Sequence, residues 1–284
     1  MRLHDRLHDL VQLVRAPAAL SVPGDALAGA SAAGRLSSRT AGTAAASVCL
    51  YWAGMAANDW ADRDLDAVER PERPIPSGRV SPNTALAVAG GLTAAGLVLA
   101  AASGGRRTLA TATLLAGAVW AYDTRLKNTA AGPAGMALCR GLDVLMGAAV
   151  GDLRRAAGPA MAVATHTYAV TALSRREVTG TDRVLPVMTM GATAAVMTQA
   201  AGRSGGWLPV VLAVWYAVRF GKAQRAVLRR PDAARVRAAV GAGITSLPAL
   251  QGALIARCGR PLLAGLVAAA APLGARLARK VSPT

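Results

Sequence analysis

A charge-free run, TAAASVCLYWAGMAA at positions 43–57, leads directly into an acidic segment, NDWADRDLD at positions 58–66. If the helical pattern of the run continues, three carboxylates share one face, those of Asp59, Asp62 and Asp66. Asn58 precedes Asp62 by one turn and joins this face. Such carboxylates repel one another unless a cation lies between them, and carboxylate and amide oxygens suit Mg²⁺. We therefore predict a magnesium site that leaves coordination positions for phosphate oxygens.

Apolar residues make up 53% of this 284-residue chain and occur in long blocks. The blocks approach the roughly 17–25 residues that cross a bilayer, and Lys and Arg gather between them, which argues against the alternative of a soluble Ala-rich helical protein. We predict an all-α fold: a polytopic membrane helix bundle of about nine transmembrane helices around a central cavity, in a single domain of residues 1–284. The blocks cover residues 17–33, 41–57, 84–103, 108–122, 133–151, 159–173, 184–202, 207–218, 236–256 and 261–275.

The formal net charge of +17 follows the expected topology. Basic residues are more numerous in the polar segments at 58–83, 123–131, 174–183 and 219–237 than in the segments between them. The positive-inside rule then places the acidic segment on the cytoplasmic side of the cell membrane. We expect no nucleic acid as a partner, because no RNA- or DNA-binding motif accompanies the charge. The Arg-rich stretch at 222–237 is expected to lie against anionic membrane lipid.

The string NDWADRDLDAVERPERPIPSGRVSP at 58–82 resembles the UbiA superfamily of intramembrane prenyltransferases. The first motif of that family is NDxxDxxxD, followed by a turn of the type R-x-x-R-P-x-x-S-G. The matching residues are Asn58, Asp59, Asp62, Asp66, Arg70, Arg73, Pro74, Ser77 and Gly78. The resemblance implies a UbiA-like helix bundle in which the four residues of the first motif bind Mg²⁺. It further implies catalytic roles for Asp59 and Asp62, and diphosphate contacts from Arg70 and Arg73.

The stretch YDTRLKNT at 122–129 is similar to the segment after the fourth span of this family. The similarity implies that Lys127 is catalytic and contacts a diphosphate oxygen, although an ordinary positive-inside lysine is an equally good interpretation. The following residues, including Cys139-Arg140-Gly141, resemble a subgroup found with Ebo-type gene clusters.

The second acidic motif departs from the family pattern. Family members carry a D-x-x-x-D-like string after the sixth span, whereas this chain has SRREVTGTDR at 174–183. Glu177 and Asp182 are its acids, and we expect them to hold a second metal ion. The alternative is that nearby arginines replace some of the metal charge. Arg176 is then a diphosphate ligand, since guanidinium groups bind phosphate well.

Asp143 lies in an apolar stretch, three residues after Arg140. An acid at this depth is costly and is usually functional or paired. One interpretation places Asp143, Arg140 and Tyr122 on the wall of an acceptor-binding cavity, and the other is an Arg140–Asp143 bridge that faces the bundle interior. His166, in the sixth span, is interpreted as a packing residue.

We predict an Mg²⁺-dependent prenyltransferase that transfers an isoprenoid group from an allylic prenyl diphosphate to a small-molecule acceptor within the membrane. The expected acceptor is a polar alcohol or polyol. Two alternatives stay open. A UbiA-type membrane terpene cyclase would ionise the same diphosphate and quench the cation internally. A non-catalytic lipid-binding or transport protein would keep the fold without turnover.

Overall fold

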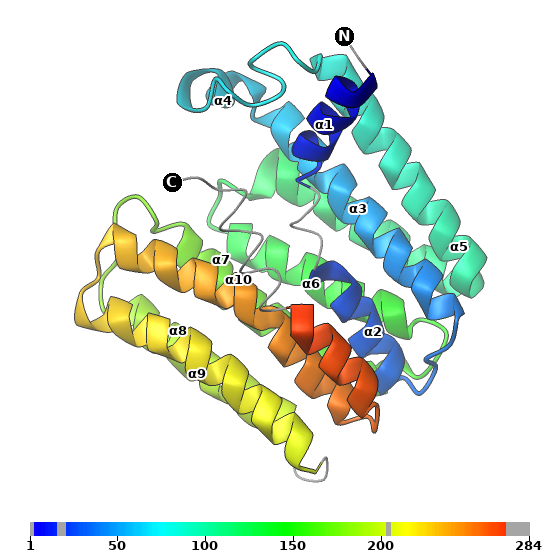
Figure 1. Cartoon of the computed structure of the whole chain (residues 1–284), viewed down its shortest axis with the longest axis vertical. Coiled ribbons are helices and arrows are strands. Elements are labelled where there is room, and N and C mark those ends of the chain that lie inside the picture. Colours follow the sequence, from blue (N-terminus) through cyan, green and yellow to red (C-terminus); the bar gives the residue numbers. More distant parts are fainter. Residues whose placement is uncertain (1–2, 16–20, 203–205, 271–284) are drawn as a thin grey trace.

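The computed structural model describes residues 3–15, 21–202 and 206–270, and within these ranges the chain forms helices and no β strand (Figure 1). The helices are α1 (Leu3–Leu13), α2 (Val22–Ala32), α3 (Arg39–Ala61), α4 (Arg63–Glu69), α5 (Pro82–Ala121), the π-helical turn η2 (Tyr122–Leu126), α6 (Gly132–Ala148), α7 (Leu153–Ser174), α8 (Val184–Ala201), α9 (Trp207–Arg229) and α10 (Ala233–Ala256). A short apolar helix, Pro261–Ala270, follows α10.

The helix α5 folds back on itself, so the two blocks predicted at 84–103 and 108–122 are separate limbs. Gly105 has a left-handed φ of 66°, which a residue with a Cβ rarely adopts. Trp120 Nε1 donates a hydrogen bond of 3.1 Å to Thr93 Oγ1. A straight helix rises about 1.5 Å per residue, so two residues this far apart in sequence meet only if the limbs run antiparallel.

The helices form a bundle with its polar connections at both ends. α3 packs along α5, α6 packs on α7, α9 packs on α8 and α10, and α2 contacts α3, α6, α7 and α10. The α7–α8 loop and the α9–α10 loop lie at the same end of the bundle (Figure 1). They are joined there by hydrogen bonds from Thr181 N to Pro231 O and from Arg237 Nη1 to the carbonyl of Glu177.

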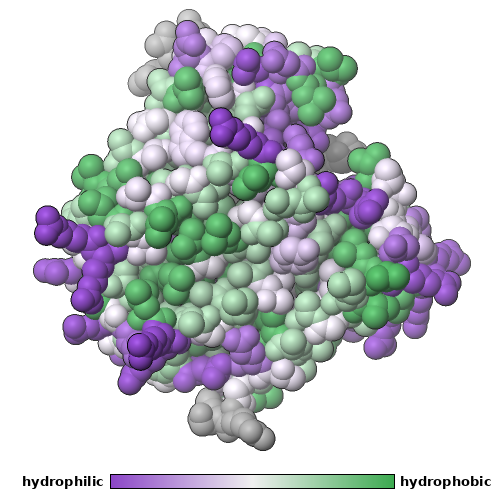
Figure 2. Space-filling model, turned by 180° about the vertical axis from the view of Figure 1, so that it is seen from behind, coloured by the Kyte–Doolittle hydropathy of each residue, from purple (hydrophilic) through white to green (hydrophobic). Residues whose placement is uncertain are grey.

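The outer surface of the bundle is suited to lipid. Three helical segments among the described residues are long and apolar enough to cross a membrane: 82–126, 184–201 and 233–256. Figure 2 shows hydrophobic and weakly polar residues over the middle of one face, with hydrophilic residues toward its edges. Large apolar side chains are exposed along α8 and α9, namely Val184, Val187, Met188, Val210, Val211, Val214 and Val218. Their exposure is expected where the surrounding solvent is hydrocarbon.

The acidic segment does not continue the helix before it, so the expected single helical face for Asp59, Asp62 and Asp66 is wrong. α3 ends at Ala61, Asp62 has the non-helical angles φ −92° and ψ 3°, and α4 starts at Arg63. The break turns α4 away from the axis of α3 at the top of the bundle (Figure 1). The carboxylates are brought together by tertiary contacts instead.

Close packing of α2 on α6 depends on two glycines. A Cβ at Gly29 would lie 1.8 Å from Val144 O, and a Cβ at Gly147 would lie 2.1 Å from Ala26 O. Small residues at such crossings let membrane helices approach closely. This contact fixes α2 against α6, the two helices that carry Asp25 and Arg140.

Gly147→Ala should lower the stability of the protein in detergent by about 1–3 kcal/mol, because its Cβ would meet backbone atoms of α2. The matched control is Gly91→Ala on α5, where no atom lies within 4 Å of the added Cβ. Thermal unfolding of both variants provides the measurement. Equal unfolding temperatures for the two variants would contradict the close α2–α6 contact.

Candidate functional site

Two buried carboxylates of the acidic segment share one arginine. Arg73 Nη1 lies 2.5 Å from Asp66 Oδ2 and 3.5 Å from Asp59 Oδ1. Arg15, just after α1, makes a second contact with Asp59 at 2.6 Å. Asp59 is 4% exposed and Asp66 is 3% exposed. Carboxylates this poorly hydrated depend on their cationic neighbours.

The other contacts come from the turn that follows α5. Lys127 Nζ lies 2.7 Å from Asp62 Oδ2, and Asn58 Nδ2 donates a hydrogen bond of 3.1 Å to Asp123 Oδ1. Asp123 belongs to η2 and is buried. We call the following residues the charged cluster: Arg15, Asn58, Asp59, Asp62, Asp66, Arg73, Asp123 and Lys127.

A cavity of ≈ 470 Å³ adjoins the charged cluster. Arg15 lines this cavity and also pairs with Asp59, so it belongs to both. Tyr51, Trp52 and Met55 line the cavity from α3, the helix that also carries Asp59 one helical turn after Met55. The predicted cavity residues Tyr122 and Arg140 also line it, together with His166 and apolar residues of α2, α6, α7 and α10.

Arg140 is held by Asp25, an acid for which the sequence suggested no role. Arg140 Nε lies 2.7 Å from Asp25 Oδ2, and Gln251 Nε2 of α10 donates to Asp25 Oδ1 at 2.6 Å. Asp143 accepts a hydrogen bond of 2.5 Å from Ser47 Oγ. The Arg140–Asp143 bridge considered above is therefore replaced by an Arg140–Asp25 bridge, while Asp143 is buried behind it and does not line the cavity.

His166 is a packing residue in part, as expected. Its Nδ1 lies 3.0 Å from the hydroxyl of Tyr216, and its ring packs edge-on against Tyr216 and Phe220. It also lines the cavity, a position that the sequence did not indicate.

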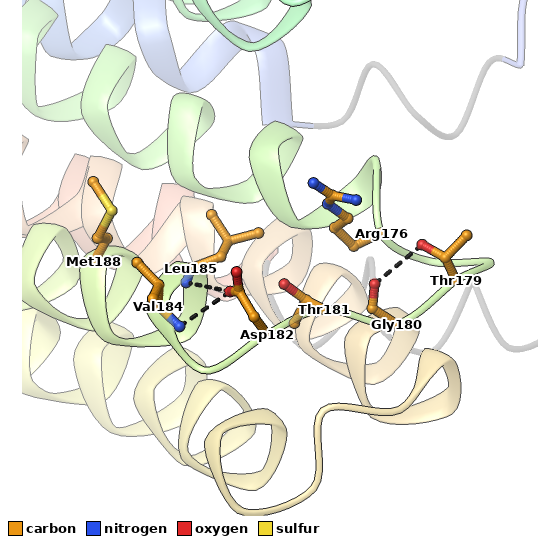
Figure 3. A pocket seen from close by; sticks show the side chains of 8 residues that line it. All are labelled: Arg176, Thr179, Gly180, Thr181, Asp182, Val184, Leu185 and Met188. Atoms are coloured by element: carbon orange, nitrogen blue, oxygen red, sulfur yellow. Dashed lines mark hydrogen bonds between the residues drawn. The ribbon is translucent and has the colours of Figure 1, made fainter.

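The α7–α8 loop forms a groove of ≈ 450 Å³ lined by Arg176 and Asp182 (Figure 3). Asp182 Oδ1 accepts hydrogen bonds from the N–H groups of Val184 and Leu185, so it satisfies otherwise free donors at the start of α8. Burial raises the pKa of Glu177, which lies near Arg237. Neither acid contacts the charged cluster. Arg175 does reach toward it, donating from Nη1 to the carbonyl of Lys127 at 3.0 Å.

Arg70 is exposed, and its side chain forms no hydrogen bond or ion pair within the part of the chain that the structure describes. The expected diphosphate ligands Arg73 and Lys127 are in the charged cluster, whereas Arg70 and Arg176 are outside it. Arg15 and Asp123 are in the cluster although the sequence did not assign them a role. Asp123 had one visible signal, since it is an acid placed directly at the end of an apolar block.

The donor atoms of the charged cluster fit Mg²⁺ in kind. Asn58, Asp59, Asp62 and Asp66 offer hard oxygens. In the ranges that the structure covers, no three or more His, Cys, Asp or Glu side chains are grouped closely enough to hold a metal ion. Arg15, Arg73 and Lys127 occupy the carboxylates instead. These cations are on long side chains, which can turn away from the carboxylates when an ion binds.

An all-helical bundle with lipid-suited helices, a buried charged cluster and an adjoining cavity defines a polytopic membrane protein with an internal site. The model of the UbiA prenyltransferase family matches residues 21–247, and the chain belongs to that family.

Relatives of known name match shorter parts of the chain. Digeranylgeranylglyceryl phosphate synthase of Natronomonas pharaonis is 43% identical over 97 residues, which are 34% of this chain and 35% of that protein. The chloroplastic chlorophyll synthase of Oryza sativa subsp. japonica is 39% identical over 82 residues, 26% of this chain and 22% of that protein. The matched region thus spans about a third of the first relative and less of the second.

Solved structures match over nearly the whole chain. A UbiA homologue from Archaeoglobus fulgidus bound to GPP and Mg²⁺ has a TM-score of 0.64 and 15% identity, covering 92% of this chain and 99% of the other. At this identity the similarity establishes the shared fold, a UbiA-like membrane helix bundle.

Asp182→Ser should leave the Mg²⁺ dependence of any activity or ligand binding unchanged, because Asp182 does not contact the charged cluster. The variant should also keep its stability, because a serine hydroxyl still accepts an N–H at the start of α8. Asp182→Ala should lower stability by about 0.5–2 kcal/mol, because the hydrogen bonds to Val184 and Leu185 are lost. Thermal unfolding and Mg²⁺ titration measure the two effects. A raised Mg²⁺ requirement in both variants would instead identify Asp182 as a metal ligand.

Proposed function

We propose that this chain is an Mg²⁺-dependent prenyltransferase that transfers an isoprenoid group from an allylic prenyl diphosphate to a small-molecule acceptor within the membrane. The observation that carries the proposal is the contact between Lys127 and Asp62 in the charged cluster, which lies beside the cavity. Arg15 belongs to both the cluster and the cavity wall. A diphosphate head needs cations and a divalent ion, and its tail needs an apolar chamber. The charged cluster and the cavity supply these two environments side by side.

Mg²⁺ bound by Asn58, Asp59, Asp62 and Asp66 would neutralise part of the diphosphate charge and polarise its oxygens. With an ion held by these carboxylates, Arg15, Arg73 and Lys127 would be available to bind phosphate oxygens. Arg73 suits a two-point contact and Lys127 acts as a point charge. The same side chains therefore balance the acids in the free protein and the diphosphate in the complex.

The reaction breaks the bond between the allylic carbon and the diphosphate oxygen. Negative charge grows on the leaving diphosphate, and the cations of the charged cluster would stabilise that charge more than they stabilise the ground state. Arg15 lines the cavity and pairs with Asp59, which supports a role for it where the diphosphate head would meet the isoprenoid tail. Apolar cavity walls exclude water, which would otherwise capture the allylic cation.

The acceptor is proposed to bind in the cavity near Arg140 and Tyr122, which both line it. Arg140 is compensated by Asp25 at 2.7 Å, so the cavity wall carries little uncompensated charge. This favours a polar, uncharged acceptor such as an alcohol or polyol over a second anion. The names of the relatives point to different acceptors, a glyceryl phosphate in one and a chlorophyll precursor in the other.

We further propose that the charged cluster faces the cytoplasm. The α9–α10 connection, where Arg229, Arg230, Arg235 and Arg237 gather, is joined by hydrogen bonds to the α7–α8 loop. Arg175 joins the α7 end to the turn that carries Lys127. These contacts support one common side for the basic loops and the cluster, and the positive-inside rule makes that side cytoplasmic.

A membrane terpene cyclase is a second candidate, favoured by the aromatic side chains of Tyr51, Trp52 and Tyr122 in the cavity wall. Aromatic faces stabilise cations, which a cyclase must do over several steps. Such an enzyme would use the same charged cluster to ionise the diphosphate.

Asp62→Asn should reduce Mg²⁺-dependent release of diphosphate from a prenyl diphosphate at least 100-fold, because it removes a metal-binding carboxylate and the partner of Lys127. Asp64→Asn is the matched control, since the side chain of Asp64 is 88% exposed and, among the described residues, forms an ion pair only with Arg63, at 3.6 Å. Diphosphate release by purified protein in lipid is the assay. Wild-type turnover by Asp62→Asn would refute the proposed function, and inactive wild-type protein that still binds the diphosphate would support a lipid-binding protein.

Incubation of membranes with labelled geranylgeranyl diphosphate and no added acceptor should give little labelled hydrocarbon, because transfer requires a second substrate. Addition of a lipid-free cell extract should then produce a labelled conjugate. Mass spectrometry of the products separates the candidates. A cyclic hydrocarbon formed without extract would identify a cyclase.

A further inference from the structure

Asp123 is a buried carboxylate in the charged cluster, outside the acidic segment at 58–66 that the sequence identified. It lies in η2 between the end of α5 and the loop before α6. The side chain is 8% exposed and accepts a hydrogen bond from Asn58 Nδ2 at 3.1 Å. Its partner Asn58 opens the acidic segment, one turn before Asp62.

The pairing with a carboxylate fixes the orientation of the Asn58 amide. Asp123 Oδ1 accepts from Asn58 Nδ2, so the NH₂ end of the amide, and not its carbonyl end, faces this carboxylate. The carbonyl oxygen, Oδ1, then faces away from Asp123. An amide without such a partner can rotate by 180° and present its NH₂ group to a cation, which it cannot bind.

The backbone around Asp123 is shaped for this contact. The N–H of Lys127 donates to the carbonyl of Tyr122, five residues back, at 3.0 Å. This wider π turn allows both Lys127 and Asp123 to contact residues at the end of α3, and such turns occur often at functional sites. On the α3 side, a Cβ at Gly54 would lie 2.8 Å from Asp123 Oδ2, so glycine leaves room for the carboxylate.

We propose that Asp123 is a positioning residue that holds Asn58 with its carbonyl oxygen available to the metal ion. This inference rests on the proposed function, and it assigns to Asp123 an action through Asn58 rather than a contact with substrate. It also gives the charged cluster an acid from η2, outside the acidic segment at 58–66. Glu177 and Asp182 have no equivalent link to the cluster.

The experiment compares Asp123→Asn, Asn58→Asp and the double variant. Asp123→Asn puts an amide beside an amide, so the orientation of Asn58 is no longer fixed. Asn58→Asp puts two carboxylates beside each other. The double variant exchanges the two groups, so that the amide at position 123 donates to the carboxylate at position 58, whose other oxygen stays free for the ion.

Two measurements are made on full-length protein in lipid nanodiscs. The first is the rise in unfolding temperature caused by Mg²⁺ with a non-hydrolysable prenyl thiodiphosphate, titrated in Mg²⁺. The second is Mg²⁺-dependent diphosphate release, with kcat and KM determined separately. Each single variant should raise the Mg²⁺ midpoint about 10–100-fold, as is typical when a residue that orients a metal ligand is lost. The double variant should recover most of the wild-type midpoint.

A wild-type Mg²⁺ midpoint in Asp123→Asn would overturn the inference, as would a double variant that is no better than the singles. Asp64→Asn serves as the control for loss of one negative charge near the cluster. If a single variant does not fold, the double variant decides alone, because only restored pairing predicts that it folds and binds Mg²⁺ like the wild type. If Mg²⁺ affects neither the wild-type protein nor Asp62→Asn, the proposed function fails together with the inference. If the wild-type protein responds to Mg²⁺, and this response is lost in Asp62→Asn but kept in the single variants at positions 58 and 123, the inference alone is overturned.

Discussion

The architecture depends on placing several carboxylates in poorly hydrated surroundings at one end of an apolar bundle. Three carboxylates of the acidic segment belong to the charged cluster, and each has a cationic partner outside that segment. Asp59 pairs with Arg15 from the segment after α1, Asp66 with Arg73 from the loop after α4, and Asp62 with Lys127 from the end of η2. Because Arg15 and Lys127 are distant from the acidic segment in sequence, satisfying its charges also joins the ends of α1, α3 and η2. The site is therefore a structural junction in the protein without ligand.

This arrangement has an energetic consequence for binding. The ion pairs offset the cost of dehydrating the carboxylates, and a divalent ion together with an anionic substrate would replace them with stronger contacts of the same kind. Charges are exchanged between partners rather than newly buried. A site of this type can thus be kept folded without its ligand and still favour a doubly charged ion.

The sequence was sufficient to predict the helical bundle, because long apolar blocks are visible without tertiary information. It also singled out Asp62, Lys127 and Arg73, which the structure brings into one cluster; their roles toward a metal ion and a diphosphate stay predictions. It failed at the helix break, because nothing in the local pattern distinguishes a continued α3 from a turn at Asp62. It also missed Asp25, which is a buried acid of α2 paired with Arg140. Whether Arg140 pairs with Asp25 or with Asp143 depends on how α2 crosses α6, and that crossing depends on Gly29 and Gly147.

Gln251 connects the start and the end of the bundle, since it donates both to Asp25 Oδ1 and to the carbonyl of Ser21 at 2.7 Å. These groups are separated by 226 and 230 positions along the chain. Gln251 lies on α10 and Asp25 on α2, so during synthesis this donor becomes available to Asp25 only after α10 is made. A chain that lacked α10 would leave Asp25 without the donor from Gln251, and its pairing with Arg140 of α6 would then have to offset the cost of burying the acid.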